Sequence, residues 1–159
     1  MYIIYEFKVY CIMKLFFFII IVFVNISQLA RAEAEQVFII DIEKLTAKKK
    51  KFNIIGNKEE GKKLFISRKV NCLSCHVAPI DSEKFQGNFG PALEKIGSRY
   101  TKDELRLRII NPKVINPDTI MPSYFIKIQY PRVAKKYFNK TIISPQEVEN
   151  LVEYLYSLK

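Results

Sequence analysis

The sequence predicts a small all-α domain in which a few helices are joined by long loops. Three segments begin with helix-capping residues, at Asn57, Thr101 and Ser144. The segments between them are rich in glycine and proline, and none alternates apolar and polar residues clearly enough to predict a sheet. A helical fold with extensive loops is therefore the expected class.

The first 32 residues are expected to be a signal peptide. Lys8 and Lys14 precede an apolar run at 15–24, and Ala30-Arg31-Ala32 follows as a small-residue cleavage site. The run is shorter than the roughly 20 residues of a membrane-spanning helix. We therefore expect export to the periplasm and cleavage after Ala32.

An uncleaved anchor that starts further upstream is the alternative, because residues 2–12 are also largely apolar. A natural start at Met13 would make residues 1–12 an over-long gene prediction. Cleavage leaves one domain at 57–159, preceded by an N-terminal extension at 33–56. Within this extension residues 37–42 are compatible with a strand, and the lysines at 48–51 are expected to be solvated in a mobile segment.

The chain is basic, with a formal net charge of +10. The leader takes Lys8, Lys14, Arg31 and Glu6 with it, so the formal charge of the mature chain is +8. On an exported protein such a charge favours an acidic protein partner rather than nucleic acid.

The first two helices are predicted from their ends. Asn57 caps the first, with Glu60 three residues later. Thr101 and Glu104 form a capping box for the second, which ends before Pro112.

The last helix has the strongest signals. Ser144 is the cap, Pro145 takes the first helical position and Glu147 the third. Behind them apolar residues follow helical spacing to the end of the chain, at Val148, Leu151, Val152, Leu155 and Leu158. The long loops at 77–100 and 111–144 are expected in a small domain only if they wrap a large rigid apolar group.

A cysteine motif indicates what that group is. Cys11 leaves with the leader, so Cys72 and Cys75 remain, and the only histidine, His76, follows at once. Cys-x-x-Cys-His is the attachment signature of c-type haem. Two thiols at this spacing reach the two vinyl groups of one porphyrin edge, and the adjacent imidazole faces the iron. We predict one covalent haem c on Cys72 and Cys75, with His76 as an axial ligand.

Three other readings of the motif are less favoured. A structural zinc site needs four ligands, and the mature chain has no further Cys or His to complete a usual set. A thioredoxin-like redox pair requires a βαβ unit, which is not visible. A disulfide between Cys72 and Cys75 would close too small a loop to stabilise much.

The sixth iron ligand follows by elimination among methionine, lysine, tyrosine and an open site. Met121 is the only methionine left after the leader is removed, and it stands beside Pro122 in a proline-rich loop. A methionine can also be core filler, but an irregular proline-rich segment favours ligation. A His/Met pair fills both axial positions, raises the reduction potential and suits electron transfer.

The Gly90-Pro91 pair lies shortly after the haem motif. The Pro91 carbonyl could accept a hydrogen bond from Nδ1–H of His76 and so orient the ring. An ordinary turn is the other interpretation of this pair.

The order of these motifs resembles class I cytochromes c. Gly61 to Phe65, the haem motif, Gly90 to Leu93, Met121-Pro122 and Tyr154-Leu155 all occur in the order of that family. The resemblance implies an all-α fold around one haem, with Gly61 letting the first helix pass close to Tyr154 on the last. It also favours Pro91 as the acceptor for His76.

A narrower resemblance is to the SoxX family, the small monohaem subunit of SoxAX cytochromes in bacterial sulfur oxidation. It covers about residues 56–159, and its most specific part is Ile115 to Pro122. Residues 71–76, 87–91, 130–134 and 144–155 also fit. The resemblance implies a non-catalytic electron-transfer subunit, partnered by a SoxA-like cytochrome subunit that holds a reactive cysteine. The complex would couple thiosulfate oxidatively to a cysteine of the carrier SoxYZ and pass electrons to a further cytochrome.

Two other functions remain open. A free class I cytochrome c that shuttles electrons to an oxidase would share every haem residue. A haem enzyme or gas sensor would need a vacant or displaceable sixth position. No catalytic residue is expected if the chain is a SoxAX-type electron-transfer subunit or a free cytochrome c.

Overall fold

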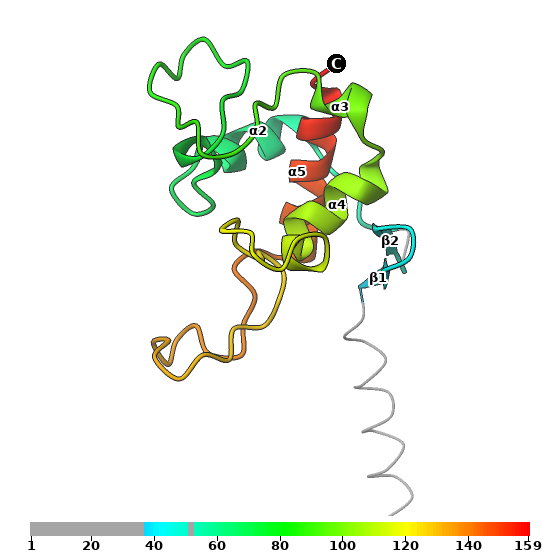
Figure 1. Cartoon of the computed structure of the whole chain (residues 1–159), viewed down its shortest axis with the longest axis vertical. Helices are drawn as coiled ribbons and strands as arrows, with labels where there is room; N and C mark the ends of the chain where they lie inside the picture. The colour runs from blue at the N-terminus through cyan, green and yellow to red at the C-terminus, as the bar shows by residue number, and fades with distance from the viewer. Residues whose placement is uncertain (1–36, 51–52) are drawn as a thin grey trace, which may run out of the picture. The chain divides into compact units, whose positions relative to one another are not determined.

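The computed structural model describes residues 37–50 and 53–159 (Figure 1). The elements in chain order are β1 (Phe38–Asp41), β2 (Thr46–Lys49), α2 (Lys58–Ile66), the 3-10 turn η1 (Cys72–Ser74), α3 (Ile96–Arg99), α4 (Lys102–Ile110), the 3-10 turn η2 (Pro112–Val114) and α5 (Pro145–Ser157). The predicted leader lies outside the described residues. Within them, no helix is both long enough and apolar enough to span a bilayer.

The three predicted helices are confirmed, each with its expected cap. The Asn57 side chain accepts from the N–H groups of Glu59 and Glu60 at the start of α2. Thr101 and Ser144 each form a complete capping box, at α4 and α5 respectively. Backbone donors that would be unpaired in the first turn are thereby satisfied.

The centre of the fold is the close crossing of α2 and α5 (Figure 1). A side chain at Gly61 would collide with the Asn150 carbonyl and with the Cβ of Tyr154, so glycine is required there. The rings of Phe65 and Tyr154 pack beside the crossing, with centroids 5.3 Å apart. The expectation that Gly61 brings the first helix against Tyr154 is confirmed.

The apolar face of α5 agrees with its periodicity except at the end. Val148, Leu151 and Val152 are buried in the core. Leu158 is only partly buried, because it lies beyond the last turn of α5, where its backbone carbonyl accepts from Gly97 N–H at 2.9 Å. Like Leu155, which is also partly buried, it keeps the predicted apolar spacing, although the helix itself ends at Ser157.

The fold is mostly helical with one small hairpin, in which β1 and β2 pair antiparallel from Phe38↔Lys49 to Asp41↔Thr46. The strand expected at 37–42 is therefore present. Its partner β2 was not predicted, because Thr-Ala-Lys-Lys shows no apolar alternation. The expectation of a mobile lysine stretch is wrong for Lys48 and Lys49: both lie in β2, and Lys49 Nζ is 3.3 Å from a carboxylate oxygen of Glu149.

A buried ion pair joins the hairpin, α4 and α5. Arg106 Nε lies 2.5 Å from Glu149 Oε1, and its Nη1 donates to the Ala47 carbonyl of β2 at 2.6 Å. Arg106 and Glu149 are almost completely buried, and Asp103 is a further partner of the guanidinium. A buried charge is tolerated only when it is paired and hydrogen-bonded in this way.

Candidate functional site

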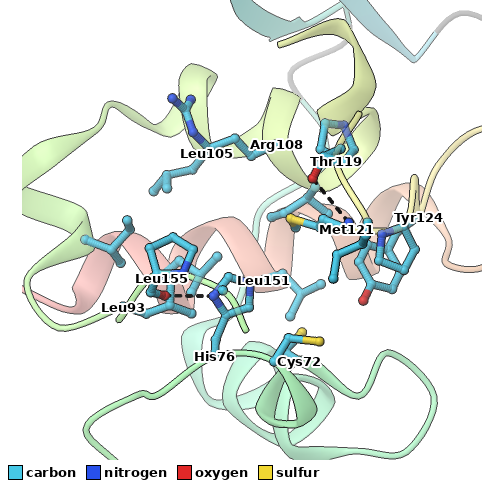
Figure 2. Close-up of a pocket in the computed structure, with 18 of the residues that line it drawn as sticks. Cys72, His76, Leu93, Leu105, Arg108, Thr119, Met121, Tyr124, Leu151 and Leu155 are labelled. Carbon is cyan, nitrogen blue, oxygen red and sulfur yellow. Dashed lines mark hydrogen bonds between the residues drawn. The ribbon is translucent and has the colours of Figure 1, made fainter. Parts of the chain in front are cut away.

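A cavity of about 330 Å³ opens between the end of α2, the loop that carries η1, helices α4 and α5, and the Met121 loop (Figure 2). Most of its lining side chains are apolar, among them Phe65, Leu93, Leu105, Ile109, Leu151 and Leu155. Its volume is in the range of small-molecule and cofactor sites. All five residues predicted for the haem site line it: Cys72, Cys75, His76, Pro91 and Met121.

The Cys-x-x-Cys-His segment is held by a tight turn. Asn71 enters the turn in the left-handed region, with φ 52°. The N–H groups of Cys75 and His76 both donate to the Cys72 carbonyl, at 3.1 and 3.0 Å. Leu73 is buried and anchors the turn. Both sulfurs and the imidazole are therefore presented together.

Cys72 and Cys75 are free thiols, so the structure has no disulfide between them. Burial raises the pKa of the Cys72 thiol to about 12. It is therefore protonated at neutral pH, whereas a nucleophilic cysteine needs a depressed pKa. Within 37–50 and 53–159 no group of three or more Cys, His, Asp or Glu side chains is placed to hold a metal ion.

His76 is oriented by the Gly90-Pro91 turn. Its Nδ1 lies 2.8 Å from the Pro91 carbonyl oxygen, drawn as a dashed line in Figure 2. A carbonyl can only accept, so Nδ1 carries the proton and the lone pair of Nε2 is free for a metal. Gly90 packs directly against the imidazole, and a Cβ at this position would collide with the ring. The expected contact between His76 and Pro91 is present.

Met121 reaches the cavity from a different segment and, in Figure 2, from the side facing His76. The loop that carries it follows α4 and η2. The Met121 N–H donates to Thr119 Oγ1 at 3.2 Å, and Ser123 Oγ donates to Asn111 Oδ1 at 2.9 Å. These bonds fix the backbone on both sides of the thioether.

Tyr124 lines the cavity and was missed by sequence reasoning. It is buried, and its hydroxyl donates to the Val70 carbonyl at 2.6 Å. Its carbonyl accepts from the N–H groups of Ile142 and Ile143, at 3.0 and 3.2 Å. Burial raises the pKa of this phenol, which stays protonated and able to donate. The available signal was an aromatic pair, Tyr124-Phe125, that begins three positions after the candidate ligand.

Arg108 on α4 was also missed, because sequence reasoning gave it no role. It is the only Lys or Arg among the cavity-lining residues. Its guanidinium lies 3.9 Å from the centroid of the Tyr100 ring, and Nη1 donates to the Glu104 carbonyl at 3.0 Å. A cation at the margin of an apolar cavity would suit the carboxylates of a bound cofactor.

These residues fit a covalent haem. The cavity offers two thiols at the attachment spacing, an imidazole with Nε2 available, a thioether on another segment and apolar walls between them. His76 and Met121 are the residues that would hold the iron, and Cys72 and Cys75 the porphyrin edge.

The family model for cytochrome c matches residues 58–159. The chain belongs to the cytochrome c family. It is an electron carrier, and membership implies a covalently bound haem c. The N-terminal hairpin lies before the matched region.

Among solved structures, this cytochrome is similar to the crystal structure of SoxXA from P. pantotrophus. The TM-score is 0.67 and the identity 24%, over 79% of this chain and 96% of that chain. Likeness at this identity shows that the fold is shared. A comparison with curated proteins gave no match.

Proposed function

We propose that this cytochrome is the electron-transfer subunit of a SoxAX-type complex. In that role it accepts the electrons released when thiosulfate is coupled to a carrier-protein cysteine and passes them to a further cytochrome. The observation that carries the proposal is the combination of the Ile115-to-Pro122 string with the fold similarity to SoxXA over nearly the whole of that chain.

The cavity supports electron transfer rather than catalysis at the metal. Haem c, when bound, supplies a one-electron couple. Cys72 and Cys75 would anchor it, and His76 and Met121 would fill both axial positions, so no substrate could reach the iron. The bond from His76 Nδ1 to the Pro91 carbonyl strengthens the imidazole as a donor. The soft thioether of Met121 favours the reduced metal.

The sulfur chemistry is assigned to a SoxA-like partner. Joining thiosulfate to a cysteine thiol forms one S–S bond and releases one proton and two electrons. This requires a reactive thiol, and both described cysteines belong to the attachment motif. The partner must therefore supply the cysteine and the route to the SoxYZ carrier, while this chain takes up the electrons one at a time.

Assembly of such a cytochrome takes place outside the cytoplasm. The predicted signal peptide at 1–32 supports export to the periplasm with cleavage after Ala32. N-terminal sequencing of the purified holoprotein tests this directly. A mature chain that begins at Glu33 is expected, and one that retains residue 13 would indicate a membrane anchor.

The test of function is thiosulfate-dependent reduction of the holoprotein, followed by absorbance. We compare the chain alone, the chain with a SoxA-like subunit from the same organism, and the chain with both that subunit and SoxYZ. Reduction is expected only when the partner and carrier are present.

Reduction of the isolated chain by thiosulfate would contradict the proposal, since it would require a nucleophile in this chain. If the full set of proteins gave no reduction while the chain still exchanged electrons with a terminal oxidase, the function would be that of a free shuttle.

A further inference from the structure

A projecting loop at residues 126–140, which we term the basic arm, follows the Met121 loop. Its root is closed by two backbone hydrogen bonds: Ile128 N–H donates to the Lys140 carbonyl at 3.1 Å, and Asn139 N–H donates to the Ile128 carbonyl at 2.7 Å. Figure 1 shows the arm in yellow and orange, extending away from α4 and α5. It is thus a defined protrusion rather than a stretch of core.

The arm carries an unbalanced positive charge. It contains Lys127, Arg132, Lys135, Lys136 and Lys140, while no aspartate or glutamate occurs between Asp118 and Glu147. Among the described residues, the last four of these cations form no ion pair and their side chains are exposed. Elsewhere lysines are commonly paired, as Lys69 with Glu147 and Lys102 with Glu153.

Aromatic rings are exposed among these cations. Tyr130, Tyr137 and Phe138 are 70%, 53% and 51% exposed. The turns beneath them are formed by backbone bonds such as Tyr137 N–H to the Ala134 carbonyl at 2.9 Å, so the rings do not hold the arm together. Aromatic residues are enriched at protein-binding surfaces, whereas lysines are found more often at the polar rim, where they steer the encounter.

We propose that the basic arm docks an acidic surface of a partner protein, which, on the function proposed above, is the SoxA-like subunit. The unpaired cations would steer and orient the encounter, and the three rings would provide the buried contacts. The arm is distinct from the cavity, but it begins two residues after Tyr124, which lines the cavity. A partner held there would therefore lie beside the cavity.

A protein suits this surface better than a membrane. Loops that insert into lipid present a broad apolar face, whereas here only three rings are exposed and two of them carry hydroxyls. An electron carrier also has to bring its cofactor close to another protein, and a tethering contact beside the cavity achieves this.

The experiment uses the holoprotein and two arm variants. Lys135→Glu/Lys136→Glu reverses exposed charges, and Tyr137→Ser/Phe138→Ser removes two rings. Lys62→Glu/Arg68→Glu is the control, since it changes net charge equally at exposed positions on and after α2. Affinity for the purified SoxA-like subunit is measured at low and high salt, and circular dichroism and the haem spectrum are recorded to verify folding.

We expect both arm variants to weaken binding at least about tenfold at low salt, and the control about twofold or less. The wild-type affinity should fall as salt rises, and the charge-reversed variant should lose most of that dependence. If the arm variants and the control variant bound the SoxA-like subunit equally well, the docking role of the arm would be overturned. The proposed complex would not be contradicted by that result.

If the SoxA-like subunit does not bind the wild-type chain, the proposed function fails, and a second probe decides the inference. Poly-L-glutamate is titrated into the isotopically labelled holoprotein, and amide shifts are mapped by NMR. Shifts concentrated at 126–140 would support recognition of acidic chains by the arm. Shifts spread over α2, or arm-dependent flotation with phosphatidylglycerol vesicles but no response to poly-L-glutamate, would overturn it.

Discussion

The hydroxyl of Tyr124 donates a 2.6 Å hydrogen bond to the carbonyl of Val70. This bond connects the segment of the candidate ligand Met121 to the segment of Cys72, although Met121 and Cys72 are 49 positions apart in the sequence. Val70 is buried, so its carbonyl has no water to replace the phenol. The bond therefore fixes the position of the Met121 segment relative to the Cys72 segment.

Tyr124→Phe should lower the free energy of unfolding of the holoprotein by about 1–3 kcal/mol, because a buried acceptor loses its partner. Equilibrium denaturation measures this loss. The thioether–iron charge-transfer band should also disappear at lower denaturant than in the wild type. Tyr130→Phe, which removes an exposed hydroxyl, is the control and should have no effect. An unchanged transition for Tyr124→Phe would show that the bond does not couple the segments.

Replacing Cys72 or Cys75 by Ala should prevent complete covalent attachment. Denaturing electrophoresis with haem staining, supported by intact mass, reports the outcome. Ser74→Ala lies within the same motif at an exposed position and should mature normally. Retention of haem in a Cys72→Ala/Cys75→Ala double variant through denaturation would refute the attachment sites.

Met121→Ala should remove the charge-transfer band at the red end of the oxidised spectrum. The reduction potential should fall, by on the order of 0.1 V, because a thioether stabilises the reduced metal more than water does. Carbon monoxide should then bind the reduced protein. Asp118→Asn, at an exposed position of the same loop outside the cavity lining, should leave all three properties unchanged. A wild-type spectrum in Met121→Ala would exclude this residue as the ligand.

Glu149→Gln should destabilise the fold by up to about 3–5 kcal/mol, since the buried Arg106 guanidinium loses its buried carboxylate and keeps only the more exposed Asp103 as a charged partner. Hydrogen exchange should show the greatest loss of protection at the β1–β2 hairpin, which Arg106 binds through the Ala47 carbonyl. Glu153→Gln breaks the more exposed pair with Lys102 and should cost about 1 kcal/mol or less. Equal losses in both variants would contradict this distinction.

The capping box of α5 should make stability depend on acid pH. Burial alone would raise the pKa of Glu147, but the hydrogen bonds from Lys69 and from Ser144 outweigh it and lower the pKa below 4.5. The carboxylate therefore stabilises the fold above pH 4.5, and this contribution is lost as the pH falls through the lowered folded pKa. Glu147→Gln should thus be less stable than wild type at pH 7, by up to about 1 kcal/mol, and equally stable near pH 2. A difference that persisted at pH 2 would point to a cause other than ionisation.

The boundaries of α2, α4 and α5 could be predicted because their signals are local, whereas α3 lies in the segment 77–100, which was wrongly predicted to be entirely loop. Asn57, Thr101 and Ser144 each cap a helix through atoms within three residues, so a short window of sequence contains the whole interaction. The contact between His76 and Pro91 was favoured by the resemblance to class I cytochromes c, because spacing alone left an ordinary turn equally open.

Interactions between distant charged residues could not be predicted. Arg106 and Glu149 both stand on helices where charged residues usually face water, and only the approach of α4 to α5 makes them partners. The same holds for Tyr124, whose acceptor Val70 lies before the haem motif. A polar residue that is buried by tertiary packing carries no periodic signal.

The hydrogen bonds that close the base of the basic arm allow the arm and the Met121 loop to change independently during evolution. Because the chain enters and leaves the arm at hydrogen-bonded positions, Ile128 and Asn139, substitutions or changes of length beyond them need not move Met121. Loop length itself has a small entropic cost, about 0.6 kcal/mol for each doubling. On the docking role proposed above, the choice of partner can therefore diverge among related chains while the placement of Met121 at the cavity stays constant.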